Sequence, residues 1–473
     1  MIHALHARLK DDLRFARVLK GGASGVAGKI AAVVVNAVSL PITVRYLGQQ
    51  QYGLWVTIST TITMIAVLDL GIANSLTNYI SRAYAEQSEE MAKRYYATAF
   101  WATCGIAILL GVIGLIISPH IDWGKLFGLS DPAIAEQSGK CVAIAFTYFL
   151  LTLPLGLANK VMGGYQRVPV ANAFAMLNSV LGLAATLLVV KMHGTIVHLM
   201  GAFCTAMLGG TVLLNLWMGL RHEPRIRPTP GKVRFGAARE ILSHGMLFFV
   251  LQIAGLIVFN TDNFIIAHFL GAEQVTPYAV TWKFVGYVSV LQSLLVPSLW
   301  PAFSEAYLGR DMVWISKTYG RVMRATLVTV GVGSLLLGFA GRWIIGLWAG
   351  KAAVPGLALL WCMCFWAVLY SICTNQAALL AATQRLRLQA AMGTLAAILN
   401  LVLSVVLVKR YGPIGVLSAT IISYLLFIVL PQTWEVRRIL RGRYLRAKAE
   451  EEGSIEEVLS AAFLTTQHSD FGE

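Results

Sequence analysis

Long apolar segments alternate with short polar turns along almost the entire chain. Most of the apolar segments have about 20 residues or more, which is the length that a helix needs to cross a ~30 Å hydrocarbon core. Twelve such segments are expected at residues 22–46, 52–81, 96–118, 138–158, 168–191, 196–219, 243–270, 275–303, 318–341, 354–381, 388–408 and 413–434. The pattern therefore predicts an all-α integral membrane protein with about twelve transmembrane helices.

The composition of the 473-residue chain supports this class, because 57% of its residues are hydrophobic and only 13% are charged. A soluble protein carries roughly 25% charged residues, so this chain has too few to cover a water-facing surface. The net charge of +15 would indicate a nucleic-acid partner in a soluble protein. In a membrane protein, basic residues crowd the cytoplasmic loops instead, and we expect no nucleic-acid partner.

The distribution of lysine and arginine predicts the orientation in the membrane. With a cytoplasmic N-terminus, 28 of the 38 basic residues fall in inner segments and 6 fall in outer loops. Because basic residues favour the cytoplasmic side, we expect both termini and the loop at 221–240 to be cytoplasmic. The first 20 residues lack a small-residue cleavage site, so no removable signal peptide is expected.

A short polar turn between the first two apolar segments recurs in altered form in the second half. Residues 45–55 read RYLGQQQYGLW and residues 268–278 read HFLGAEQVTPY, so that Gly48 and Gly271 are 223 residues apart. A turn that recurs at half the chain length indicates a duplicated architecture. The first turn joins expected spans one and two, and the second joins spans seven and eight.

A second repeated motif supports the duplication. GYQR at 164–167 and ATQR at 382–385 are 218 residues apart, which is close to the spacing of the first pair. Six spans per half is an even number, which gives both halves the same orientation, as in transporters built from parallel repeats. The expected organisation is a cytoplasmic amphipathic lead-in at 1–20, an N-terminal six-helix bundle at 21–220, a basic cytoplasmic linker at 221–240, a C-terminal six-helix bundle at 241–434 and a cytoplasmic tail at 435–473.

A few charged side chains lie deep in the expected spans, and each needs a reason at that depth. They are Lys29, Asp69, Asp262 and Lys283. Counting ~1.5 Å per helical residue, Asp262 and Lys283 fall at similar depth on adjacent antiparallel helices, so an ion pair is expected. Two interpretations stay open. Either these groups form structural pairs, or the lysines bind an anionic substrate and the aspartates respond to a coupling ion.

Each of the other candidate residues has a purely structural interpretation as well as a functional one. Arg45 is either a substrate contact or a side chain that snorkels to the outer interface. Trp282 either belongs to an aromatic belt or faces a cavity and stacks on sugar rings. Pro41 and Pro297 interrupt spans one and eight, and each is a hinge or a static kink, because proline removes a helical hydrogen bond.

Signals for catalysis and for cofactors are absent from the sequence. The chain contains no P-loop, no GxSxG and no HExxH motif, and its loops are too short to hold a soluble active site. Its six cysteines all fall in apolar segments without a metal-ligand spacing. We expect no enzyme activity, no metal and no cofactor.

Several short motifs in order along the chain resemble those of a known family. They are Leu47-Gly48-x3-Tyr52-Gly53-Leu54-Trp55, Leu68-Asp69-Leu70-Gly71-Ile72, Asn260-Thr261-Asp262, Leu270-Gly271 and Tyr278-Ala279-Val280. With the twelve-span layout, they resemble the polysaccharide-biosynthesis flippases, whose superfamily also holds the multidrug and toxin extrusion transporters. The likeness covers about residues 20–435.

The resemblance implies two six-helix bundles around a central cavity in the bacterial cytoplasmic membrane. It implies transfer of a polyprenyl-diphosphate-linked oligosaccharide from the inner to the outer leaflet by alternating access, for O-antigen, exopolysaccharide or capsule synthesis. Membrane lipids and polysaccharide polymerase or export proteins would be the other partners. Sugars and diphosphate do not cross hydrocarbon unaided, so a cavity with cations suits such a substrate.

Three alternatives to this function stay open. A cation-coupled drug or metabolite exporter of the same fold would line its cavity with acids, whereas this chain has about as many deep lysines as aspartates. Lipid II flippases of the superfamily often have two further spans, which this chain is not expected to have. A membrane polymerase or ligase would need a large outer loop.

Overall fold

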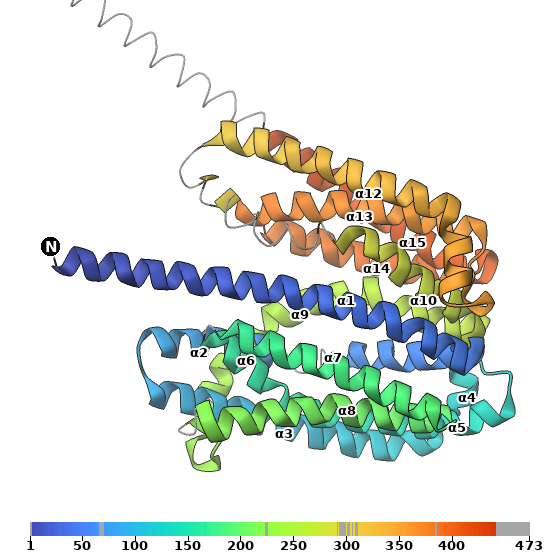
Figure 1. Cartoon of the computed structure of the whole chain (residues 1–473), viewed down its shortest axis with the longest axis horizontal. Helices are drawn as coiled ribbons and strands as arrows, with labels where there is room; N and C mark the ends of the chain where they lie inside the picture. Colours follow the sequence, from blue (N-terminus) through green and yellow to red (C-terminus); the bar gives the residue numbers. More distant parts are fainter. Residues whose placement is uncertain are drawn as a thin grey trace, which may run out of the picture. The chain divides into compact units, whose positions relative to one another are not determined.

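The computed structural model describes residues 2–65, 71–165, 167–222, 226–290, 292, 299, 303–304, 306–307, 311–383 and 386–440. Every regular element in these ranges is a helix (Figure 1). The first part of the chain forms α1 (Ile2–Ile65), α2 (Ile72–Ala85), α3 (Glu89–Ile117), α4 (Trp123–Leu126), α5 (Pro132–Leu155), α6 (Leu157–Gly164), α7 (Val168–Lys191) and α8 (Ile196–Trp217). The later part forms α9 (Phe235–Leu270), α10 (Ala272–Gly286), α12 (Met312–Trp348), α13 (Leu357–Ala382), α14 (Leu386–Tyr411) and α15 (Pro413–Tyr424).

Membrane-spanning length and apolarity are found throughout the described chain. Nine helical segments of the described residues are long and apolar enough to cross a membrane, and the first of them, Ile30–Ile65, covers residues 30–46 of the first expected span and 52–65 of the second. Expected spans seven and eight correspond to α9 and to α10 with the residues that follow it. The all-α multi-pass membrane fold that the sequence predicts is confirmed.

Glycine turns occur at the two positions that the sequence pairs. Gly48 has φ 72° and ψ −174° and splits α1 into two helices. Gly271 has φ 91° and ψ 154° and separates α9 from α10. Both values lie outside the regions open to residues with a Cβ atom, which explains why each turn contains glycine. The two turns therefore have similar backbone geometry as well as similar sequence.

Packing divides the described residues into two compact units. The first takes in those of 2–283, 342–359 and 400–419, and the second takes in those of 284–341, 360–399 and 420–440. This grouping follows contacts rather than sequence order. It does not test the expected bundle boundaries on either side of the linker at 221–240, which stay a prediction.

In the first unit, α7 packs on both α1 and α8, and α2 packs on α3, α6 and α9 (Figure 1). A core of buried side chains joins α2, α3, α6, the end of α8 and the beginning of α9. Its members are Ile72, Leu76, Ile80, Ala83, Ala92, Tyr95, Tyr96, Ala99, Leu157, Ala158, Val161, Met162, Leu214, Met218, Ile226, Ala237 and Ile241. This core fixes α2 and α6 as a rigid pair.

The second unit has its own core and a buried polar network. Phe303, Met312 and Leu379 are members of the core. In the network, the Gln292 side chain donates to the Ser371 carbonyl at 2.7 Å, and Asn375 donates to Thr326 at 2.9 Å. Buried polar groups need such partners, so these hydrogen bonds help to fix helix packing.

Candidate functional site

The two glycine turns lie against each other, and we call residues 45–55 and 268–278 the first and second corner. The Gln49 side chain donates to the Glu273 carbonyl at 3.1 Å, and the Thr276 hydroxyl donates to the Gln49 carbonyl. Gly53 lies so close to Ala272 that a Cβ atom at Gly53 would be 1.7 Å from the Ala272 carbonyl oxygen. The corners of the two sequence repeats are thus in direct contact.

The loop between α4 and α5 packs against the same contact. A Cβ atom at Gly128, which has φ 57°, would be 2.5 Å from the Ala267 carbonyl oxygen, so glycine is needed there for close approach. The Ser130 hydroxyl is 3.1 Å from the Gln50 side-chain amide and 3.4 Å from the Glu273 carboxylate. The loop therefore covers the edge of the paired corners.

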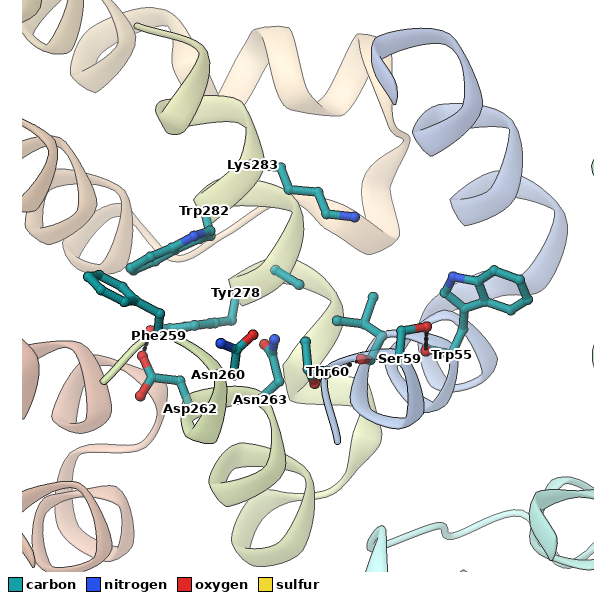
Figure 2. Close-up of a pocket in the computed structure, with 12 residues that line it drawn as sticks. Trp55, Ser59, Thr60, Phe259, Asn260, Asp262, Asn263, Tyr278, Trp282 and Lys283 are labelled. Carbon is teal, nitrogen blue, oxygen red and sulfur yellow. Dashed lines mark hydrogen bonds between the residues drawn. The ribbon is translucent and has the colours of Figure 1, made fainter. Parts of the chain in front are cut away.

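A cavity of about 190 Å³ lies among the helices that leave the two corners. Its wall comes from the second helix of α1, the last turns of α9 and the middle of α10 (Figure 2). The lining residues are Trp55, Val56, Ser59, Thr60, Phe259, Asn260, Asp262, Asn263, Tyr278, Ala279, Trp282 and Lys283. Both sequence repeats thus contribute to one cavity.

Asp262 is buried in the cavity wall rather than projecting into open space. Only 3% of its surface is exposed. The Tyr278 hydroxyl donates to its Oδ2 at 2.5 Å, while Oδ1 has no hydrogen-bond partner. The adjacent Asn263 also has a buried Oδ1 without a partner. A buried unpaired oxygen costs roughly 1–3 kcal/mol, so these two oxygens are available to a proton or a cation.

Lys283 is exposed to the cavity and extends away from Asp262 (Figure 2). The salt bridges among the described residues do not include one between these two side chains. The expected Asp262–Lys283 ion pair is therefore wrong. The depth estimate placed both residues at a similar level of adjacent helices, but the carboxylate turns into the contact between α9 and α10 and the ammonium group turns into the open space.

Aromatic and hydroxyl side chains complete the cavity wall. The Trp282 ring stacks on Tyr278 with the ring centroids 6.2 Å apart, and Trp55 is held edge-on by Phe203 of α8 at 5.2 Å. The Ser59 and Thr60 hydroxyls donate to carbonyls one turn earlier in α1, at 2.8 and 3.0 Å. Their donors are used within the helix, so they offer the cavity oxygen acceptors.

The other predicted site residues lie elsewhere or outside the described structure. Arg45 belongs to the first corner, where its guanidinium donates to the Leu347 carbonyl, and it does not line the cavity. Lys29 lies on α1, where only its backbone is described. Asp69 and Pro297 lie outside the described residues, so their predicted roles stay predictions.

Pro41 lies within α1, where the helix continues through it. A proline leaves the carbonyl four residues earlier without its helical donor, which here is the carbonyl of Ala37. The Trp348 indole nitrogen at the end of α12 donates to that carbonyl at 2.8 Å. The break at Pro41 is therefore satisfied by a specific partner, and its predicted role as a hinge is untested.

Charge-based reading of the sequence missed the neutral members of the cavity, among them Ser59, Thr60, Asn263 and Tyr278. One signal was available: the run Asn260-Thr261-Asp262-Asn263 is four polar residues inside an otherwise apolar span. Polar residues in a membrane span are rare and mark cavities or pathways. Tyr278 had no comparable signal, because tyrosine is common at membrane interfaces.

Two solved structures of membrane transporters share the fold of this chain. The chain aligns with the inward-facing conformation of a multidrug resistance MATE family transporter of the MOP superfamily, with a TM-score of 0.74, 12% identity, and coverage of 88% of this chain and 95% of that one. It also aligns with the lipid II flippase MurJ in an inward closed conformation, with a TM-score of 0.70, 14% identity, and coverage of 88% and 87%. The chain therefore has the same fold as these two solved structures.

Sequence relatives then identify the family. Residues 18–307 match the family described as polysaccharide biosynthesis protein, and the chain belongs to that family. It is 24% identical over 427 residues, 88% of this chain and 95% of the relative, to a Salmonella typhi protein named for a proposed role as an O-antigen transporter. It is 23% identical over 290 residues, 60% of this chain and 64% of the relative, to a Yersinia pseudotuberculosis protein named similarly for O-antigen export.

Proposed function

We propose that this protein moves a polyprenyl-diphosphate-linked oligosaccharide from the inner to the outer leaflet of a bacterial cytoplasmic membrane, for surface polysaccharide synthesis. The observation that carries the proposal is the cavity beside the paired corners. It combines one exposed lysine with tryptophan rings and neutral oxygen and amide groups. Among the described residues, Lys283 has no salt bridge, so its charge is available to an anion.

Each part of such a substrate has a matching group in this cavity. A diphosphate is a strong acceptor of hydrogen bonds from an ammonium group. Sugar rings present hydroxyls to Asn260, Ser59 and Thr60 and flat faces to Trp55 and Trp282. The lipid tail stays in the hydrocarbon, where it costs no transfer of apolar surface into water.

Alternating access completes the proposal. The charge distribution of the sequence places the corners on the outer side and both termini in the cytoplasm. Closed corners then separate the cavity from the outer face, and their separation opens a path to the outer leaflet. While the corners are closed, the glycan enters the cavity from the inner side of the membrane.

The decisive experiment measures flipping in vesicles that contain the purified protein and a polyprenyl-diphosphate-linked sugar. We expect Lys283→Ala to reduce the flipping rate at least about tenfold, because a hydrogen bond to a charged group contributes roughly 1.5–3 kcal/mol, while Lys283→Arg retains part of the rate. The matched control is Lys125→Ala, which removes an exposed lysine that pairs with Asp122 at 3.2 Å. A normal rate in Lys283→Ala, with normal insertion, would remove this lysine from the substrate path.

A second candidate function, cation-coupled export, is favoured by a different observation. Asp262 Oδ1 and Asn263 Oδ1 are both buried without a hydrogen-bond partner, and such oxygens suit a proton or a sodium ion. We expect Asp262→Asn to abolish any dependence of transport on an imposed proton or sodium gradient. Vesicles of the unaltered protein that take up a cationic dye, and flip no glycan, would establish export instead.

A further inference from the structure

A second set of polar side chains lies on α2, at a distance along the sequence from the cavity. The buried face of α2 holds Ile72, Leu76 and Ile80. Asn74 and Thr77 are half-buried, and Asn78 and Ser81 are exposed. α2 belongs to an expected membrane span, where lipid-facing polar groups are costly and rare. These polar side chains on α2 therefore call for polar partners.

The neighbouring helix α6 adds a cation to this polar face. Lys160 Nζ donates to Asn74 Oδ1 at 3.0 Å. The Thr77 hydroxyl is 3.4 Å from the Lys160 carbonyl, and the Ser81 hydroxyl donates to the Gly164 carbonyl at 3.3 Å. We call Asn74, Thr77, Ser81, Lys160 and Gly164 the α2–α6 seam.

Close packing makes the seam a rigid feature. A Cβ atom at Gly164 would lie 2.6 Å from the Ile80 side chain and 3.0 Å from the Thr77 carbonyl oxygen. Ile80 has no exposed surface and belongs to the core that joins α2 and α6. The position of Lys160 relative to Asn74 is therefore set by packed helices and not by a loop.

Lys160 has no carboxylate partner within the described part of the chain. Its ammonium group has three donors, and the hydrogen bond to Asn74 uses one of them. Because a neutral amide rather than a carboxylate holds this half-buried lysine, its other donors remain for an incoming anion. Asn78, one turn after Asn74 on the same face, adds an exposed amide.

Two tyrosines follow the seam, Tyr84 near the end of α2 and Tyr165 directly after the end of α6. The rings of Tyr84 and Tyr165 meet edge to face with their centroids 5.7 Å apart, and Tyr84 is 40% exposed. Along this side of the helices the order is therefore lysine and amide first, then an accessible aromatic ring. A glycolipid has the same order, because its phosphate joins the lipid tail to the sugar.

Depth in the membrane agrees with this order. Lys160 precedes the end of α6 at Gly164 by four residues, which is about 6 Å along a helix. The headgroup region on each side of a bilayer has a similar thickness of roughly 5–7 Å. A phosphate at the membrane surface would thus reach Lys160 while its sugar lies beside Tyr84.

We infer that the α2–α6 seam is an entry site for the glycolipid, where Lys160 and Asn74 bind the phosphate nearest the lipid and Tyr84 packs on the first sugar. This inference rests on the proposed function and adds a second substrate-binding site to it. The substrate would meet the seam at the inner leaflet before its diphosphate reaches Lys283.

The test measures binding to the purified full-length protein in detergent by three probes. They are a short-chain polyprenyl diphosphate, the same lipid with one hexose attached, and phosphatidylglycerol. We expect Lys160→Gln to weaken both polyprenyl probes at least about tenfold, as expected for one lost charged hydrogen bond, and Lys160→Arg to retain most of the affinity. Tyr84→Ala should weaken only the hexose-bearing probe, by several-fold.

The matched control is Lys93→Gln, which removes a half-buried lysine near the same end of the first unit, on α3. It should change binding less than about twofold, the scatter of a surface charge change. Unchanged affinity in Lys160→Gln would overturn the entry site. Equal losses for phosphatidylglycerol and the polyprenyl probes would also overturn it, because the seam would then bind any anionic headgroup. The proposed function fails separately, if the unaltered protein does not prefer the hexose-bearing probe over phosphatidylglycerol.

Discussion

Replacing Gly53 by alanine is expected to force the two corners apart. The added Cβ would lie 1.7 Å from the Ala272 carbonyl oxygen and 2.6 Å from its carbonyl carbon, whereas ordinary contacts are 3.4–4 Å. Backbone atoms cannot turn aside as a flexible side chain can. The corners must therefore separate by about 1.5 Å or more, since packed interiors have few voids that could absorb the displacement.

The magnitude follows from the contacts that this movement breaks. The Gln49–Glu273 hydrogen bond is 3.1 Å long, and the Thr276–Gln49 hydrogen bond joins the same segments. Each is worth about 1 kcal/mol, so their loss disfavours the closed corners by about 2 kcal/mol. Since 1.4 kcal/mol corresponds to a factor of ten, the ratio of open to closed corners should rise about 30-fold.

The assay measures the distribution of distances between two spin labels, at residues 51 and 274. Each label lies three residues after the glycine of its corner. We expect a single short distance in the unaltered protein and a second, longer population in Gly53→Ala. The control is Gly201→Ala, because a Cβ atom there meets nothing within 4 Å. A distribution in Gly53→Ala that superimposes on that of the unaltered protein, in folded material, would refute the reasoning about the corner contact.

Two further predictions concern hydrogen bonds in the first unit. Tyr278→Phe leaves the buried Asp262 without its donor, so we expect a loss of about 1–3 kcal/mol of unfolding free energy, measured by chemical denaturation in detergent. Adding Asp262→Asn to the same chain should recover part of this loss. An unchanged denaturation midpoint in the single variant would contradict the hydrogen bond. Trp348→Phe removes the donor to the Ala37 carbonyl and should cost about 1 kcal/mol, seen as a lower unfolding temperature. Its control is Trp343→Phe, which alters a ring that is 70% exposed, and equal shifts in the two variants would show that Trp348 does not satisfy the break at Pro41.

Apolar segment length alone predicted the helical membrane fold, because a bilayer leaves few choices for the backbone. The recurrence of a leucine–glycine pair predicted two equivalent turns, since glycine is required where φ is positive. What the sequence did not contain was the contact between those turns. Gly53 and Ala272 are small residues of ordinary appearance, and only the packed structure reveals that their backbones touch.

Part of the candidate site was also predictable from the sequence. Asp262 and Lys283 are conspicuous in two neighbouring apolar spans, and counting residues placed them at a similar depth. The direction of each side chain was not predictable, because two residues at one depth can face each other or face apart. Tyr278 decides the matter at Asp262, since its hydroxyl takes the place that the lysine was expected to fill.

The geometry of the first unit connects the corners to the cavity through short, stiff helices. Gly53 touches the second corner, and Trp55, Ser59 and Thr60 follow within two turns of the same helix. The opposite wall begins in the same way, because Tyr278 and Lys283 lie on the helix that starts beside Ala272. A separation of the corners cannot leave the distance between these two walls unchanged, since each wall moves with its own helix. Opening the corners would therefore alter the cavity as well, and the proposed alternating-access function needs such a link between opening and weaker substrate binding.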